Sequence, residues 1–172
     1  GAASVSASQV TPIQGFGIVD LVRVPGGTTS MMPMQGNRLG ERSTFVNAVT
    51  PGWFATYGMP LKSGRDFTNA DLQARSMMIV VNEAFARKFL RGRNPIGANV
   101  EFDAAPGPVG KTVIGVVGDA AYNSLRERDV PIEYIPLVQG AMLGPGNEMT
   151  ISVRSAGGSP TRSGSPASAA SC

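Results

Sequence analysis

Residues 77–92 constrain the fold most, because they place a buried strand directly before an amphipathic helix. Residues 77–81 form a continuous apolar run of strand length. Asn82 follows in the position of a helix N-cap. Phe85 and Phe89 stand four residues apart, which is the spacing of an inward-facing helical stripe. The segment predicts a strand–helix unit, which is half of a β-α-β motif.

Strand-like segments recur on both sides of this unit. Each combines β-branched or alternating apolar residues in the two-residue period of a strand. They span residues 3–10, 18–24, 43–49, 99–103, 112–117, 132–135 and 149–154. Thr50 and Gly58 predict the N-cap and the left-handed last residue of a second short helix. This order predicts an α+β domain of β-α-β units, with mixed sheets and helices packed on one face.

Residues 25–42 are rich in Gly, Met, Pro and Asn and show no periodicity. We interpret them as a long loop, and a loop of this length in a compact domain is usually functional or mobile. Met31, Met32 and Met34 cluster within it. Because a thioether side chain repacks easily, such a cluster suits a partner contact, and it equally suits anchoring of the loop. Both interpretations stay open.

Residues 155–172 differ in composition from the rest of the chain. They are almost entirely Ser, Ala, Gly and Pro, with Arg162 as the single charged side chain. Such a segment cannot bury enough apolar surface to offset its ordering entropy. We therefore expect a low-complexity, disordered tail after a core domain that spans residues 1–154.

The residue inventory argues against an enzyme. The chain has no histidine, and its one cysteine is Cys172, so Ser-His-Asp triads, Cys–His pairs and intramolecular disulfides are excluded. Lys62, Lys88 and Lys111 are expected in ordinary surface positions. Asp66 and Asp71 resemble an acidic pair, but Asp66 is better explained as an acceptor for local backbone amides. We expect no cofactor, no metal and no catalytic residue.

Nucleic acid is also an unpromising partner. The net charge is only +3, and no run of Lys and Arg forms a basic arm. The predicted strands carry mainly Val, Ile and Met rather than the exposed aromatics on which RNA bases stack. The glycines of residues 115–119 lack the Lys-Ser/Thr of a phosphate loop, so we interpret this stretch as a turn after a buried strand.

Ordered sequence blocks carry a resemblance to a known family. Four of them are V-T-P-G-W-F at 49–54, G-M-P-L at 58–61, G-R-D-F at 64–67 and V-V-N-E-A-F-A at 80–86. Further blocks follow at residues 95–97, 113–119, 133–136 and 149–154. In this order and spacing they resemble the extracytoplasmic, periplasmic core domain of MacB-type ABC-transporter permeases. The resemblance covers about residues 1–154.

The resemblance implies β-α-β subdomains and a smaller inserted β-rich subdomain, which we place around residues 52–110. It implies a non-catalytic domain that transmits ATP-driven conformational change and contacts an adaptor or a substrate during export. The implied location is the periplasm, as part of an inner-membrane protein. The implied partners are an ATPase subunit or domain, reached through transmembrane helices, a periplasmic adaptor and a second copy of the permease. In the family, a strand and a helix usually precede the equivalent of residues 1–3, and an amphipathic helix follows the equivalent of Arg154. We therefore expect the domain to be incomplete at both ends.

Two other functions remain alternatives at this stage. One alternative to the permease domain is a free-standing module that binds a peptide or a small ligand, and the other is a non-functional translated fragment of a permease. Flanking segments of about 20 apolar residues, the length that crosses a bilayer, distinguish the permease from both alternatives.

Overall fold

The computed structural model describes residues 2–11, 18–23, 34–35, 38–74, 76–103, 107–119, 129–140 and 149–156. The main sheet contains β1 (Ala2–Ser8), β2 (Ile18–Arg23), β5 (Ser43–Val49), β6 (Leu61–Gly64), β7 (Met78–Asn82), β8 (Asn99–Phe102), β9 (Val109–Val117), β10 (Ile132–Pro136) and β11 (Thr150–Ser155). A separate hairpin consists of β3 (Met34–Gln35) and β4 (Arg38–Leu39). The helical segments are α1 (Trp53–Thr56), η1 (Asp71–Gln73), α2 (Glu83–Phe85), η2 (Ala86–Leu90) and α3 (Leu137–Gly140), of which η1 is a 3-10 turn and η2 is π-helical.

Six strands of the main sheet close into a ring. The pairing order runs β10-β7-β9-β8-β2-β5, and β10 also pairs with β5. The closing pair is parallel and joins residues 45–49 to residues 132–136. Closure removes the open edges that a flat sheet of these strands would present. β6 pairs with β9 outside the ring, and β1 meets the end of β5 through the pair Ser8 and Val49.

The strand–helix unit predicted for residues 77–92 is confirmed. The Asn82 side chain accepts a hydrogen bond from the backbone N–H of Phe85 at 2.9 Å, as an N-cap does. The rings of Phe85 and Phe89 lie 4.7 Å apart between centroids. β7 runs parallel to β9, and the crossover connection between them passes through α2, η2 and β8.

Two apolar clusters occupy the two sides of the ring. The first takes at least one buried side chain from each of the six strands, so it fills the interior of the ring, and Phe85, Phe89 and Leu90 close it from the helical side. The second lies on the outer side, where Trp53 and Phe54 of α1 pack against Tyr134. α1 and the α2–η2 helix therefore bury their apolar residues in different clusters.

α1 begins differently from the sequence expectation. Thr50 does not cap it: the Oγ1 atom of Thr50 accepts a hydrogen bond from the N–H of Ala7 at 2.9 Å instead. The N-cap is Gly52, whose φ of 82° lies in the left-handed region that favours glycine. Gly58 ends the helix with a φ of 67°, as predicted. The prediction for Thr50 was wrong because its hydroxyl is hydrogen-bonded to Ala7 of β1, which lies 43 residues earlier in the chain.

The α+β fold class with a mixed sheet is confirmed, although strands outweigh helices. The long loop predicted for residues 25–42 contains the β3–β4 hairpin in its described part, so the expectation of irregular structure was wrong there. Residues 24–33 and 36–37 lie outside the described residues, as do residues 157–172 of the tail. The inserted subdomain around residues 52–110 stays a prediction.

Candidate functional site

The antiparallel pair of β1 and β11, which we call the ribbon, turns an apolar face outward. Val5 is paired with Val153, and Ala7 with Ile151. The exposed fractions are 59% for Val5, 65% for Ile151 and 47% for Val153, and Met149, immediately before β11, is 57% exposed. Four large apolar side chains this exposed on one small ribbon form a patch of the kind that marks interaction sites.

The opposite face of the ribbon is polar and holds α1. The Tyr57 hydroxyl lies 2.6 Å from the Ser152 hydroxyl, and the Thr56 hydroxyl donates to Ser4 at 3.1 Å. Arg154 donates to the backbone carbonyl of Ala55 at 3.0 Å. Strands alternate sides residue by residue, so seating the hydroxyl side on α1 necessarily turns Val5, Ile151 and Val153 to solvent.

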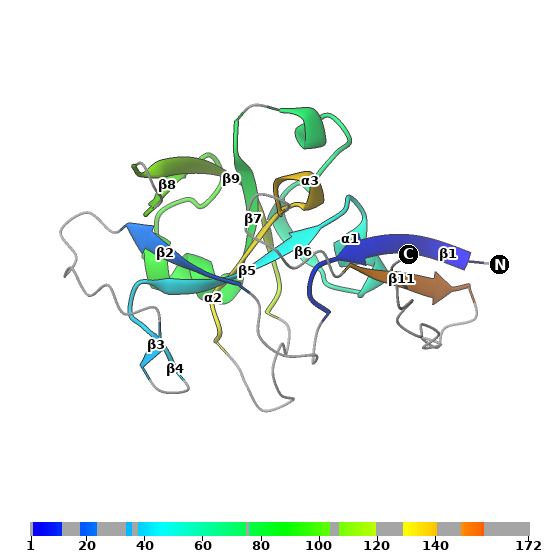
Figure 1. Ribbon diagram of the computed structural model, residues 1–172, viewed down its shortest axis with the longest axis horizontal. Coiled ribbons are helices and arrows are strands. Elements are labelled where there is room, and N and C mark those ends of the chain that lie inside the picture. The colour runs from blue at the N-terminus through cyan, green and yellow to red at the C-terminus, as the bar shows by residue number, and fades with distance from the viewer. Residues whose placement is uncertain are drawn as a thin grey trace, which may run out of the picture.

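The ribbon also brings together two distant parts of the chain. Ala2 at the start of β1 is the partner of Ser155 at the end of β11. Figure 1 shows β1 and β11 side by side at one end of the molecule, with β2 and β8 at the other. The two ends of the described part of the domain therefore lie next to each other.

Inside the ring, one lysine is held between two carboxyl groups. The Nζ atom of Lys111 on β9 lies 2.8 Å from Oδ2 of Asp20 on β2 and 2.8 Å from Oε1 of Glu133 on β10. The Lys111 side chain is 5% exposed and that of Glu133 is fully buried. The ammonium also lies 3.9 Å from the centroid of the Phe102 ring, a favourable cation–π distance. These contacts tie three strands of the ring together.

Burial and the neighbouring charges shift the pKa values of Glu133 and Lys111. Burial raises the pKa of Glu133 to about 8, against the opposing pull of Lys111 and with the help of the negative charge on Asp20. The Oε2 atom of Glu133 is buried without a hydrogen-bond partner among the described residues. Burial lowers the pKa of Lys111, but the two carboxylates outweigh it and hold that pKa above its ordinary value.

The sequence expectation for the lysines was wrong in two of three cases. Lys62 is exposed as expected. Lys111 is buried, and Lys88 is half-buried and donates to the carbonyls of Gly40 and Ser43 at 3.1 and 3.2 Å. The signal for the buried cluster was strand parity: Asp20, Lys111 and Glu133 each stand two residues before an apolar residue that faces the interior, namely Val22, Val113 and Ile135.

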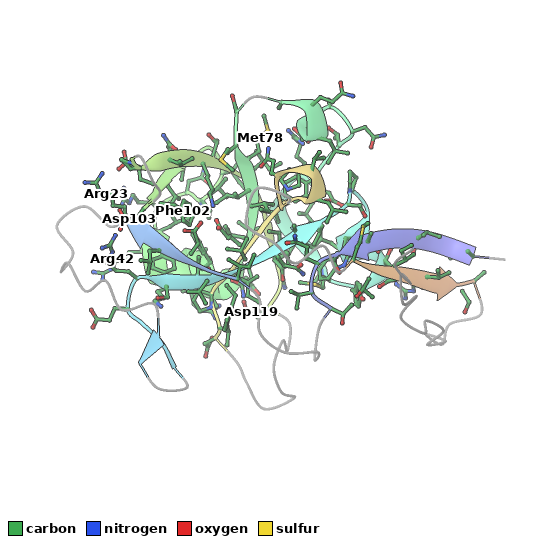
Figure 2. The ribbon with its side chains drawn as sticks, viewed as in Figure 1. Arg23, Arg42, Met78, Phe102, Asp103 and Asp119 are labelled. Atoms are coloured by element: carbon green, nitrogen blue, oxygen red, sulfur yellow. The ribbon has the colours of Figure 1, made fainter. Side chains whose placement is uncertain are left out.

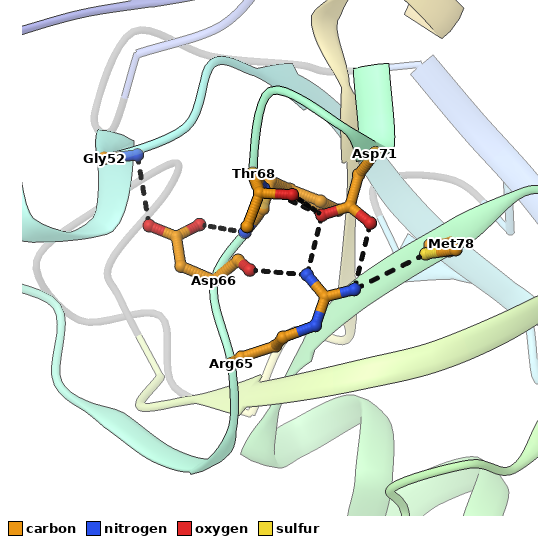
Figure 3. Close-up of polar contacts among 7 residues, drawn as sticks. Gly52, Arg65, Asp66, Thr68, Asp71 and Met78 are labelled. Carbon is orange, nitrogen blue, oxygen red and sulfur yellow. Dashed lines mark hydrogen bonds and ion pairs between the residues drawn. The ribbon is translucent and has the colours of Figure 1, made fainter. Parts of the chain in front are cut away.

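The acidic pair Asp66 and Asp71 is structural, as Figure 3 shows. Asp66 accepts hydrogen bonds from the N–H groups of Gly52 and Phe67 at 3.1 and 2.6 Å, which confirms the expected role. Asp71 receives two hydrogen bonds from the Arg65 guanidinium, at 2.6 and 2.9 Å, and others from Thr68. The Arg65 guanidinium holds the pKa of Asp71 well below its usual range.

The proposed methionine contact lies largely beyond what is described. Met31 and Met32 fall outside the described residues, and Met34 begins β3. Among the described residues, no group of three or more Asp, Glu, His or Cys side chains is arranged to hold a metal ion. No helix in the described part of the chain is long and apolar enough to cross a bilayer.

Comparison with known proteins places the chain in a family. Residues 3–161 match the MacB-like periplasmic core domain. The chain belongs to that family. The expectation drawn from the ordered sequence blocks is thereby confirmed: the chain is a domain of the MacB-like periplasmic core type. No curated protein sequence matches the chain.

Solved structures of permease domains share the fold. The periplasmic region of MacB from Actinobacillus actinomycetemcomitans aligns with a TM-score of 0.59 and 20% identity, over 93% of this chain and 61% of that one. The extracellular domain of the ABC-type transporter YknZ from Gram-positive bacteria gives 0.54 and 18%, over 91% and 67%. A permease domain from Porphyromonas gingivalis gives 0.52 and 18%, over 92% and 58%. This MacB-like domain thus spans about three fifths of the MacB periplasmic region.

Proposed function

We propose that this domain is a non-catalytic coupling element of an ABC exporter, which passes ATP-driven motion from the membrane to the extracytoplasmic side. The observation that carries the proposal is the pairing of Ala2 with Ser155 in one ribbon. A domain inserted between two membrane-spanning segments receives force through both of its ends. Because the two ends of this domain are paired strands, they deliver that force through a single hydrogen-bonded element.

The junction between ribbon and ring suits such transmission. The Oγ1 atom of Thr50 contacts both the N–H and the carbonyl of Ala7, at 2.9 and 3.3 Å. The backbone N–H of Thr50 also donates to Ala7, and that of Gln9 to Ala48. On the other side, α1 is hydrogen-bonded to the ribbon and packed by Trp53 into the outer cluster. A displacement of the ribbon therefore acts on the ring at two points.

The apolar face of the ribbon is the surface that we assign to contact with the rest of the export machinery, either an adaptor or a substrate. Its four exposed side chains, Val5, Met149, Ile151 and Val153, gain free energy when a partner removes them from water. In this proposal the parent protein lies in the inner membrane and works as a pair of copies with an ATPase subunit or domain. The domain itself then faces the periplasm.

The gene that encodes the chain separates this function from the two alternatives. Reading several hundred nucleotides on each side should reveal segments encoding about 20 consecutive apolar residues, enough to span a bilayer. Stop codons on both sides without such segments would leave a free-standing binding module or a translated fragment, and the coupling role would be lost.

The contact surface is tested in the full-length transporter. Val153→Asp places a charge in the apolar face, whereas Leu61→Asp makes the same change at a 44% exposed apolar residue on β6. We expect export to fall at least about fivefold for Val153→Asp and to change less than twofold for Leu61→Asp, because a buried unpaired charge is costly only where a partner covers it. Equal export by both variants would remove the ribbon face from the proposal.

A further inference from the structure

A cavity of about 360 Å³ opens where the π-helical segment η2 meets β8 and the end of β2. Its volume falls within the range of small-molecule sites, about 300–1,000 Å³. Its apolar lining consists of Val22, Phe89, Leu90, Ile96, Ala98 and Val100. The polar lining consists of Arg23, Arg93, Asn94 and Asn99, with the backbone of Gly97. The described lining thus combines an apolar wall with cations and amides, and contains no carboxylate.

The two arginines of the lining differ in how far they are already neutralised. Arg23 lies 3.6 Å from Glu101 and 3.8 Å from Asp103, and Asp103 is itself paired with Arg42 at 2.5 Å. Figure 2 shows Arg23, Arg42 and Asp103 together at the end of β2. Arg93 has no ion pair with any described residue. The balance of charge at the cavity is therefore positive, with Arg93 as the cation available to a ligand.

The wall of the cavity is formed by irregular backbone. η2 is π-helical over Ala86–Leu90, and single π-turns are frequent at functional sites. Arg91 follows with a φ of 44°, a left-handed conformation that is strained for a residue with a side chain. The π-helical turn contributes Phe89 and Leu90 to the cavity wall, and Arg93 belongs to the lining as well.

We propose that this cavity binds a small organic anion with an apolar body, such as a medium-chain carboxylate or an aryl sulfonate. The apolar body lies against Phe89, Leu90 and Val100, and the anionic group pairs with the guanidinium of Arg93. This site lies at the β2–β8 end of the molecule, away from the ribbon (Figure 1). The proposal therefore goes beyond the coupling role and stands whether or not the ribbon couples.

The test compares two fluorescent probes on the 172-residue chain. 1-Anilinonaphthalene-8-sulfonate carries an anionic group, and N-phenyl-1-naphthylamine carries the same rings without it. We expect Arg93→Gln to weaken binding of the sulfonate about fivefold to tenfold, because a charge-assisted hydrogen bond is lost. Binding of the neutral probe should change less than twofold. Arg91→Gln is the matched control, since it removes the same charge two residues away, outside the lining. It should change the affinity for each probe by less than twofold.

Ala98→Phe fills the cavity and should displace both probes, while sodium decanoate should compete with the sulfonate on the unaltered chain. If Ala98→Phe unfolds in a thermal melt, the comparison of Arg93→Gln with Arg91→Gln decides alone. Equal losses of sulfonate binding in these two variants would indicate a general basic surface and overturn the proposal. Sulfonate binding that is absent, or that is unaffected by Arg93→Gln, would overturn it as well.

Discussion

Lys111 and Glu133 meet inside a closed ring of strands, with Nζ 2.8 Å from Oε1 and both side chains excluded from water. Asp20 completes the cluster, so the interior holds one ammonium and two carboxyl groups. A fully paired interior would need one carboxyl group to carry a proton. Glu133 is that group, because its pKa is raised to about 8 by burial.

Stability should fall as the pH rises from about 4.5 to about 8. Within that window the folded chain keeps the proton on Glu133 while the unfolded chain has released it, so the unfolded state binds fewer protons and unfolding is favoured by rising pH. The slope from this one group is at most about 1.4 kcal/mol per pH unit. Urea unfolding at several pH values should show this decline, and Glu133→Gln should flatten it. A Glu133→Gln profile parallel to that of the unaltered chain would mean that Glu133 is ionised throughout.

Replacing Lys111 by Met should destabilise the domain by about 3–5 kcal/mol at neutral pH, because the carboxyl groups of Asp20 and Glu133 lose their shared cation in a buried site. Lys62→Met, at an exposed lysine, should change the free energy of unfolding by no more than about 0.5 kcal/mol. Chemical denaturation measures both. The cost of Lys111→Met should shrink when Asp20→Asn and Glu133→Gln are present, and an undiminished cost would assign the loss to packing.

Asp71→Asn should destabilise the domain by about 2 kcal/mol at pH 7, because Asp71 is nearly buried and accepts two hydrogen bonds from Arg65. Since the pKa of the folded Asp71 is depressed, its contribution is present above about pH 4 and is lost as the pH falls further. Unfolding free energies of the two proteins should therefore converge in acid. A difference that stays constant down to pH 2 would exclude the ion pair as its source.

Gly64→Ala should cost several kcal/mol more than Gly92→Ala. Both glycines have a left-handed φ, 73° and 80°, so the conformational penalty of about 1 kcal/mol is shared. At Gly64 a Cβ atom would lie 2.2 Å from the carbonyl oxygen of Ile114, whereas nothing lies within 4 Å of one at Gly92. Thermal melts of both variants check the difference. Equal shifts in Tm would show that β6 adjusts to admit the methyl group.

Local sequence patterns predicted most of the individual elements. The Asn82 cap, the Phe85–Phe89 pair and the alternation of β8 could be predicted because each depends on residues a few positions apart in the sequence. The assignment to β-α-β architecture followed from their order.

Ring closure was not readable, because the parallel pair of β5 and β10 joins residues about 87 positions apart, from Phe45 to Ile132. The interior cluster depends on the same closure, since Lys111 meets Glu133 and Asp20 only across the ring. The outward face of the ribbon reversed the usual expectation that the apolar side of a strand faces the core. That reversal is set by hydroxyl contacts with α1 from Ser4 and Ser152, which no local period indicates.

The coupling role is tested most directly by hydrogen exchange on the full-length transporter, measured with and without ATP and vanadate. We expect that trapping the ATPase changes amide protection in the ribbon, residues 2–8 and 150–155, and at its junction with residues 47–50. Amides of β9 and β10 should stay protected in both states, since the closed ring is the rigid part. Protection that is the same in both states throughout the ribbon and its junction would contradict the coupling role.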